Sequence, residues 1–316
     1  MPPTSFDSPS KQHCEDLGGS ILKLLEIIGR PKIEVDFEHF IDLYKKEKIE
    51  EDRKELARLK AIFKKDSEEG GYDLKYNQML GRTFEVLVRY CISKKEWLGK
   101  NVEIVPVSEF DDVKNGIDIL LKFIQAGNNI NFLALGIDLT MSHHLFDKLN
   151  RIKSEIDQGH LAKMDYFLDG NHKGQVSNIP RTIVGIDKDL IVKLMESITT
   201  GMADAVNDKK IKYLILRESE IQLEIYQKYA LNRSKIESEK AKELMKAGRL
   251  EEAQKTLELS SKQISIAEKL GTDLRIVLDL QAKHTDSMSP NTRADILDKD
   301  TVFKEMQKLL FSIFQY

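Results

Sequence analysis

The chain has 316 residues, of which 41% are hydrophobic and 32% charged, so it can bury a sizeable core beneath a charged, helix-rich surface. Its 49 basic and 52 acidic side chains leave a net charge of -3, which excludes a global electrostatic attraction to nucleic acid. Two cysteines, Cys14 and Cys91, exclude a disulfide scaffold and a zinc finger. No run approaches the roughly 20 apolar residues of a membrane span, and the first residues do not resemble a secretory signal. We therefore expect a cytoplasmic protein without a membrane partner.

The N-terminal part predicts a tail followed by helices. Residues 1–15 predict a loose tail, rich in proline and serine at its start. Residues 16–71 predict a helical segment, in which an apolar face at 21–28 is followed by the breakers Gly29 and Pro31. Asp36 is a candidate cap, and the charged run after it predicts a solvated helix with a narrow apolar stripe.

Residues 72–205 predict an α/β core, because the period of the apolar residues changes there from helical to alternating. In chain order the expected elements are a helix at 76–94, strands at 102–107, 117–124 and 130–139, a helix at 144–156, a strand at 181–187 and a helix at 190–198. The turn residues 127–129 predict that the second and third strands form a hairpin. The polar, glycine-containing stretch 169–178 predicts a flexible loop.

The C-terminal part predicts a long helical hairpin at 206–286, followed by a linker and a final helix at 287–316. Its helices are expected at 218–247 and from Leu250 up to Gly271, separated by Gly248. Residues 211–216 fit either a last strand or the start of the first of these helices. The hairpin offers a surface for a second copy of the chain or for a protein partner.

Two aspartates inside apolar strands are the most informative feature. Asp118 lies between Ile117 and Ile119, and Asp138 between Ile137 and Leu139. If the turn at 127–129 joins the strands symmetrically, the two aspartates lie directly opposite, with Cβ atoms about 5 Å apart. Two carboxylates at that spacing repel, so one is protonated or a cation bridges them. Mg²⁺ commonly binds one or two carboxylates together with water and phosphate oxygens.

Glu85, on the helix before the strands, is a third candidate acid beside the apolar Phe84 and Val88. The order of an acidic helix, an edge strand, an aspartate strand and a third strand ending in aspartate resembles the PD-(D/E)XK, or restriction-endonuclease-like, nuclease superfamily. The resemblance covers about 120 residues, from Tyr76 to about Ile198. It implies that Glu85, Asp118 and Asp138 bind Mg²⁺ or Mn²⁺ in a nuclease core of helix, three strands, helix and strand.

The chain departs from the family pattern at the lysine expected two residues after the third-strand acid, where Thr140 stands. Lys148, on the following helix, is our preferred replacement as a catalytic residue. Lys122 shares the strand and face of Asp118 but lies about 13 Å along it. With no lysine at the site, water activation would depend on the metal or on His143 or His144.

The resemblance implies a nucleic-acid substrate, DNA in preference to RNA, cleaved by metal-dependent hydrolysis of a phosphodiester. Residues around the site that could contact it are Thr140, His143, His144, Arg151 and Lys153. Such contacts to phosphates would be independent of base sequence and would weaken with salt.

Three alternatives stay open. Asp118 could hydrogen-bond a backbone turn, and Asp138 could cap the next helix. The chain could have a degraded nuclease site and act as a nucleic-acid or protein binding module, which Thr140 favours. It could also be a helical scaffold built on the hairpin, in which case truncation near residue 205 separates a metal-binding core from the partner surface.

Overall fold

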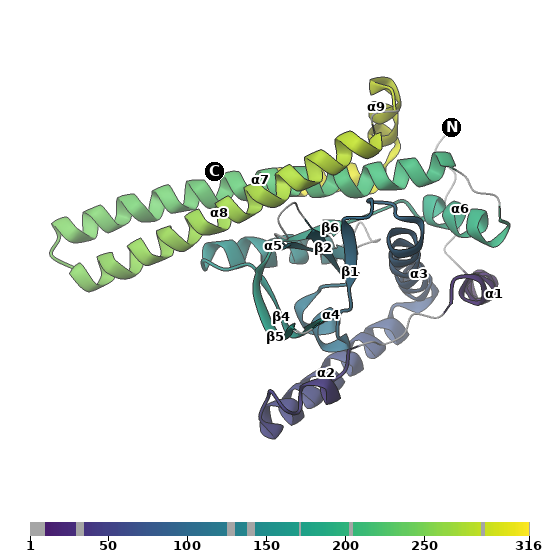
Figure 1. The fold of residues 1–316 in the computed structure, drawn as a ribbon, viewed down its shortest axis with the longest axis horizontal. Helices are drawn as coiled ribbons and strands as arrows, with labels where there is room; N and C mark the ends of the chain where they lie inside the picture. The colour runs from purple at the N-terminus through teal and green to yellow at the C-terminus, as the bar shows by residue number, and fades with distance from the viewer. Residues whose placement is uncertain are drawn as a thin grey trace.

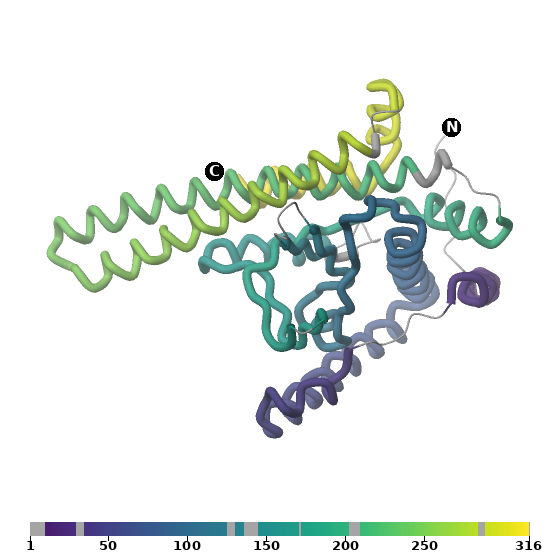
Figure 2. Tube along the Cα trace, in the orientation of Figure 1, coloured from purple at the N-terminus to yellow at the C-terminus, as the bar shows by residue number. Residues whose placement is uncertain are grey.

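The computed structural model describes residues 10–29, 35–124, 130–137, 143–170, 172–201, 205–285 and 288–315. It is a mixed α/β protein in which helices predominate around a small sheet (Figure 1). The colour ramp of Figure 2 shows that the teal middle of the chain forms this sheet, while the green and yellow C-terminal part lies along one side. No helix among the described residues combines the length and the apolar character needed to cross a membrane.

The central sheet has four strands in the order β1-β2-β3-β6. These strands are β1 (Val102–Val105), β2 (Ile119–Ile124), β3 (Ile130–Ile137) and β6 (Arg181–Val184). Strands β1, β2 and β3 form an antiparallel meander, and β6 pairs parallel with β3. The parallel pair requires a long crossover, and α5 (His143–Asp157) begins that crossover.

The β2–β3 register differs from the expected one by two residues. Ile119 pairs with Leu135 and Leu120 with Ala134, so the numbers of paired residues sum to 254 and not to the expected 256. The prediction that Asp118 and Asp138 are directly opposed is therefore wrong. A shift of two residues preserves the face on which a side chain lies, because side chains alternate with period two. Asp138 itself lies outside the described residues.

The two faces of the sheet are covered by different elements. Ile119, Leu121 and Phe123 of β2 belong to the main core, which includes side chains from α3 (Gly71–Lys95), α5 and α6 (Lys188–Thr199). The alternate residue Leu120 packs with Met164 and Phe167 in a smaller cluster beneath a second sheet. Because both faces are covered, β2 has a nearly continuous apolar sequence.

The second sheet is a hairpin of β4 (Ala162–Asp169) and β5 (His172–Ile179). The prediction of a flexible loop at 169–178 is wrong, because β5 occupies most of that range. This strand is polar since most of its side chains are exposed, and apolar alternation therefore gives little signal. Lys173 of this strand pairs with Asp42, at 2.5 Å.

The N-terminal elements pack against the body at two places. Helix α1 (Lys11–Ile28) begins inside the stretch expected to be a tail and lies against α3 and α6. The 3₁₀ helix η1 (Phe37–Phe40), capped by Asp36, precedes α2 (Lys46–Glu69). Its aromatic side chains surround Tyr166 of β4 in edge-to-face contacts, with Phe40 at 5.1 Å between ring centroids.

The C-terminal part forms an antiparallel hairpin of α7 (Ala205–Lys246) and α8 (Leu250–Thr285). Residues 211–216 belong to α7, and α8 continues past Gly271. The expected linker contains α9 (Pro290–Lys299), capped by Ser289, and α10 (Thr301–Ile313) follows it. Figure 1 shows the closed end of the hairpin projecting beyond the body; we call residues 234–260 the arm.

Candidate functional site

Asp118 lies at the point where the chain enters β2. Its neighbours Ile117 and Ile119 are fully buried, whereas Asp118 is half-buried. Its backbone N–H donates to the Leu135 carbonyl at 3.2 Å, which continues the pairing with β3. The buried neighbours therefore fix the position of Asp118 at the start of β2.

Glu85 and Arg89 approach Asp118 from α3. They are one helical turn apart, and the Arg89 guanidinium contacts the Glu85 carboxylate at 3.0 Å. Arg89 also donates to the backbone carbonyl of Asp118. The buried α3 residues Phe84 and Val88 anchor this turn in the main core. The structure therefore brings the predicted residues Glu85 and Asp118 into one cluster.

Asp112 is a further acid of this cluster that the sequence analysis did not identify. It lies on α4 (Glu109–Asn115), which Ser108 caps at its start and Gly116 ends in a left-handed conformation with φ of 65°. The Asp112 carboxyl is hydrogen-bonded to the Asp118 carboxyl. In the sequence, Asp112 lies six residues before Asp118, with Gly116 between them as a helix end. This spacing indicates a shared site only if the short helix α4 is predicted as well.

The acids of this cluster are held together against their mutual repulsion. Burial raises the pKa of Asp112 well above its ordinary value, and the Asp118 and Glu85 charges act in the same direction. Burial also raises the pKa of Glu85, an effect that Arg89 opposes and Asp118 strengthens. A bound cation would relieve this repulsion, as would the proton that a raised pKa retains.

Side chains of α5 and β6 hydrogen-bond the turn between Asp112 and Asp118, and Asp111 ties its helix to β4. Arg181 of β6 is buried, donates to the Asn115 carbonyl and forms two bonds to the Glu155 carboxylate at 3.0 and 3.1 Å. Arg151 of α5 donates to the Lys114 carbonyl at 3.1 Å.

Asp111 accepts hydrogen bonds from the backbone N–H groups of Asp165 and Tyr166, at 2.7 and 3.0 Å. The site therefore rests on α5, β4 and β6 together.

The other predicted site residues have different outcomes. Lys148 is half-buried on α5, on the same helical face as Arg151 and Glu155. Lys153 pairs with Asp157 at 2.8 Å and lies over the ring of Tyr229 of α7, so its ammonium group faces the hairpin. Lys122 is held by Asp169 at 2.8 Å and Glu103 at 3.3 Å.

Asp138 and Thr140 lie outside the described residues, as do the side chains of His143 and His144, whose backbone begins α5. Within the part of the chain that is described, no group of three acidic, histidine or cysteine side chains is close enough together to hold a metal ion. Asp112 and Asp118 nevertheless supply two adjoining carboxyls, which match the hard oxygen donors that Mg²⁺ uses with water.

Comparison of the chain with family models, with curated proteins and with solved structures found no match.

Proposed function

We propose that this protein hydrolyses phosphodiester bonds of nucleic acid, DNA in preference to RNA, with the help of Mg²⁺ or Mn²⁺. The observation that carries the proposal is the convergence of Glu85, Asp112 and Asp118 from α3, α4 and the start of β2. Carboxyls that repel one another at the mouth of a sheet are more typical of a functional site than of a structural ion pair.

The order of elements supports the same proposal. Helix α3, the meander β1–β2–β3, helix α5 and the parallel strand β6 follow the sequence implied by the resemblance to PD-(D/E)XK nucleases. Glu85 and Asp118 take the positions of the helix acid and of the second-strand acid in that resemblance. Asp112 has no counterpart among the residues carried over from that family.

Asp112 and Asp118 would hold the cation, with Glu85 next to them and Asp138 as the further acid that the resemblance implies. When bound, the cation would polarise the phosphate and lower the pKa of a water molecule. Arg89 orients the site, since it holds the Glu85 carboxylate and the Asp118 carbonyl at once. Lys148 lies one helical turn before Arg151, whose side chain contacts the turn between Asp112 and Asp118. Lys148 would offset negative charge on the phosphate.

A binding module without catalysis is the second candidate. The ion pair between Glu85 and Arg89 favours it, because an arginine already neutralises one of the acids that a metal would need. Such a protein would bind nucleic acid without a divalent cation. Binding and cleavage must therefore be measured separately.

The test is cleavage of labelled single- and double-stranded DNA and RNA with Mg²⁺, Mn²⁺ or EDTA. Asp118→Asn and Asp112→Asn are expected to lower the rate by about a hundredfold or more, the scale of losing an electrostatic group at a reacting centre. Asp147→Asn, at an exposed acid of α5, is the matched control and should cut like the wild type.

Mg²⁺ should also raise the melting temperature of the wild type but not of Asp118→Asn, because only the folded site binds the ion. Wild-type cutting by both site variants would contradict the proposal. Nucleic-acid binding without any cleavage, unchanged by EDTA, would establish the second candidate instead.

A further inference from the structure

A pocket of about 450 Å³ lies where the base of the β4–β5 hairpin meets α8. Its polar lining consists of Asn178 at the end of β5 and of Ser261, Lys262, Ser265 and Lys269 along α8. The volume lies in the range of small-ligand pockets, about 300–1,000 Å³. None of Glu85, Asp112 and Asp118 lines it, so it is separate from the site proposed above.

The charge of this pocket is positive only. Lys262 and Lys269 are seven residues apart, so they lie on one face of α8. Neither of them forms an ion pair with any described acidic side chain, and no acidic residue lines the pocket. On the arm, by contrast, Arg249 pairs with Glu252. Lys269 also lies near enough to the buried Asp273 to lower the pKa of that carboxyl, but it forms no ion pair with it, so both ammonium groups can still contact an anion.

Asn178 adds a neutral donor. Its backbone is left-handed, with φ of 59°, a conformation that asparagine tolerates better than most residues. Its Oδ1 accepts from the Leu161 N–H at 3.3 Å, which fixes the amide at the pocket. The Nδ2 group has no partner among the described residues, so it can donate to a ligand.

Gly159 allows the end of α5 and helix α8 to approach closely at the pocket. Gly159 follows α5 with φ of 77°, and a Cβ there would lie 2.9 Å from Leu259 Cδ1 and 3.1 Å from Lys262 Cβ. Glycine suits this left-handed conformation, and a larger residue would have to displace the Leu259 and Lys262 side chains. The Lys262 side chain therefore starts close to the end of α5.

We propose that this pocket binds a phosphate group. Ammonium groups and an amide N–H are donors that phosphate oxygens accept, and charge-assisted bonds of this kind are about twice as strong as neutral ones. The phosphate could belong to a small molecule or to a polynucleotide backbone, and both sources present the same oxygens.

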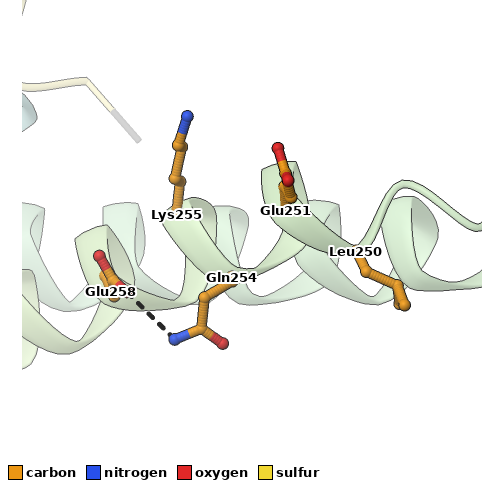
Figure 3. A pocket seen from close by; sticks show the side chains of 5 residues that line it. All are labelled: Leu250, Glu251, Gln254, Lys255 and Glu258. Carbon is orange, nitrogen blue, oxygen red and sulfur yellow. Dashed lines mark hydrogen bonds between the residues drawn. The ribbon is translucent and has the colours of Figure 1, made fainter.

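A second surface depression makes a useful contrast. It lies on α8 near the tip of the arm, and Figure 3 shows Glu251 and Glu258 lining it together with Lys255 and Leu250. Gln254 donates to Glu258 within it, at 3.1 Å. Two carboxylates against one ammonium group make this depression unsuitable for an anion, so Lys255 is a suitable control position.

The test measures binding of pyrophosphate by calorimetry and of a labelled single-stranded oligonucleotide by anisotropy, at low salt and without divalent cations. Lys262→Gln with Lys269→Gln should weaken binding by about tenfold or more, because two charge-assisted contacts are lost. Asn178→Asp should do the same independently, since it keeps the acceptor for Leu161 but replaces the donor by a negative charge. Lys242→Gln with Lys255→Gln removes equal charge from exposed arm positions and should bind like the wild type.

Loss of pyrophosphate binding alone would assign the pocket to a small phosphate ligand, and loss of oligonucleotide binding would assign it to a polynucleotide backbone. If the wild type binds neither probe, or if the pocket variants bind both as tightly as the arm control, the proposal is overturned. Cleavage is not the readout, so failure of the proposed hydrolysis would leave this result intact.

Discussion

Asp111 and Asp273 are both completely buried acids, yet their surroundings are opposite. The Asp111 carboxyl accepts from Ser108, Asn115 and two backbone N–H groups, and these bonds oppose the rise in its pKa that burial causes. Neither carboxyl oxygen of Asp273 on α8 has a hydrogen-bond partner. Burial raises the pKa of Asp273 to about 7, and Lys269 opposes the shift only in part.

We predict that Asp273 makes the protein less stable as pH rises. Its carboxyl holds a proton in the folded state up to a pH of about 7, whereas the unfolded chain releases it near the ordinary value of 3.8. Stability should therefore fall between these two values and then level off. Asp273→Asn should be more stable than the wild type at about pH 8, and the difference should shrink at about pH 5.

Urea unfolding at both pH values checks this prediction, with Asp279→Asn, at an exposed position of the same helix, as the control. An equal effect of Asp273→Asn at both pH values would contradict the prediction, because it would show that the folded and the unfolded protein hold the same number of protons at this carboxyl across that range.

At the scale of elements, the edge of the sheet at β6 is closed by a side chain. Gln222 of α7 accepts from the Ile183 N–H at 2.8 Å and donates to the Ile183 carbonyl at 2.7 Å. Its amide thus makes the two bonds that a neighbouring strand would make. The backbone groups of Ile183 are thus paired although no further strand follows β6 in the sheet.

We expect Gln222→Leu to lower the free energy of unfolding by about 2–5 kcal/mol, because two buried backbone groups lose their partners. Gln254→Leu removes an exposed glutamine of α8 and should have little effect. Denaturation in urea measures both variants. A loss for Gln222→Leu no larger than that of the control would mean that water or a shifted side chain replaces the amide.

At the scale of the whole molecule, the hairpin is both part of the core and an extension from it. Ile211, Ile215 and Leu223 of α7 belong to the main core together with strand residues of the sheet. Truncation near residue 205 would therefore expose the core and the β6 edge, and it cannot separate a metal-binding body from a partner surface. Farther along, Arg233 contacts Asp157 at 3.0 Å and Gln263 reaches the same end of α5.

The arm beyond these contacts should be removable. Replacement of residues 238–256 by a short glycine-rich turn is expected to change the melting temperature by no more than about 3 °C, since few buried contacts with the body are lost. Calorimetry should still show one cooperative transition. A loss of cooperativity would mean that the arm stabilises the body through contacts of its own.

Much of the element order follows from sequence patterns alone. The helices near 76–94, 144–156 and 190–198, the meander strands and the long hairpin all lie close to their expected positions. Their apolar periodicity is local, and Gly, Pro and capping residues mark their ends. The hairpin β4–β5 was missed because one of its strands is mostly exposed and polar, so its pairing depends on partners distant in the sequence.

Glu85 and Asp118, and the types of element that carry them, could be predicted from sequence patterns, because these depend on neighbours within a few turns. The β2–β3 register, the approach of Asp112 and the contact of Arg89 with the Asp118 carbonyl are visible only in the folded chain. Register and helix placement depend on how whole faces pack together, which no local pattern contains. Side chains from separate elements meet only after that packing is complete.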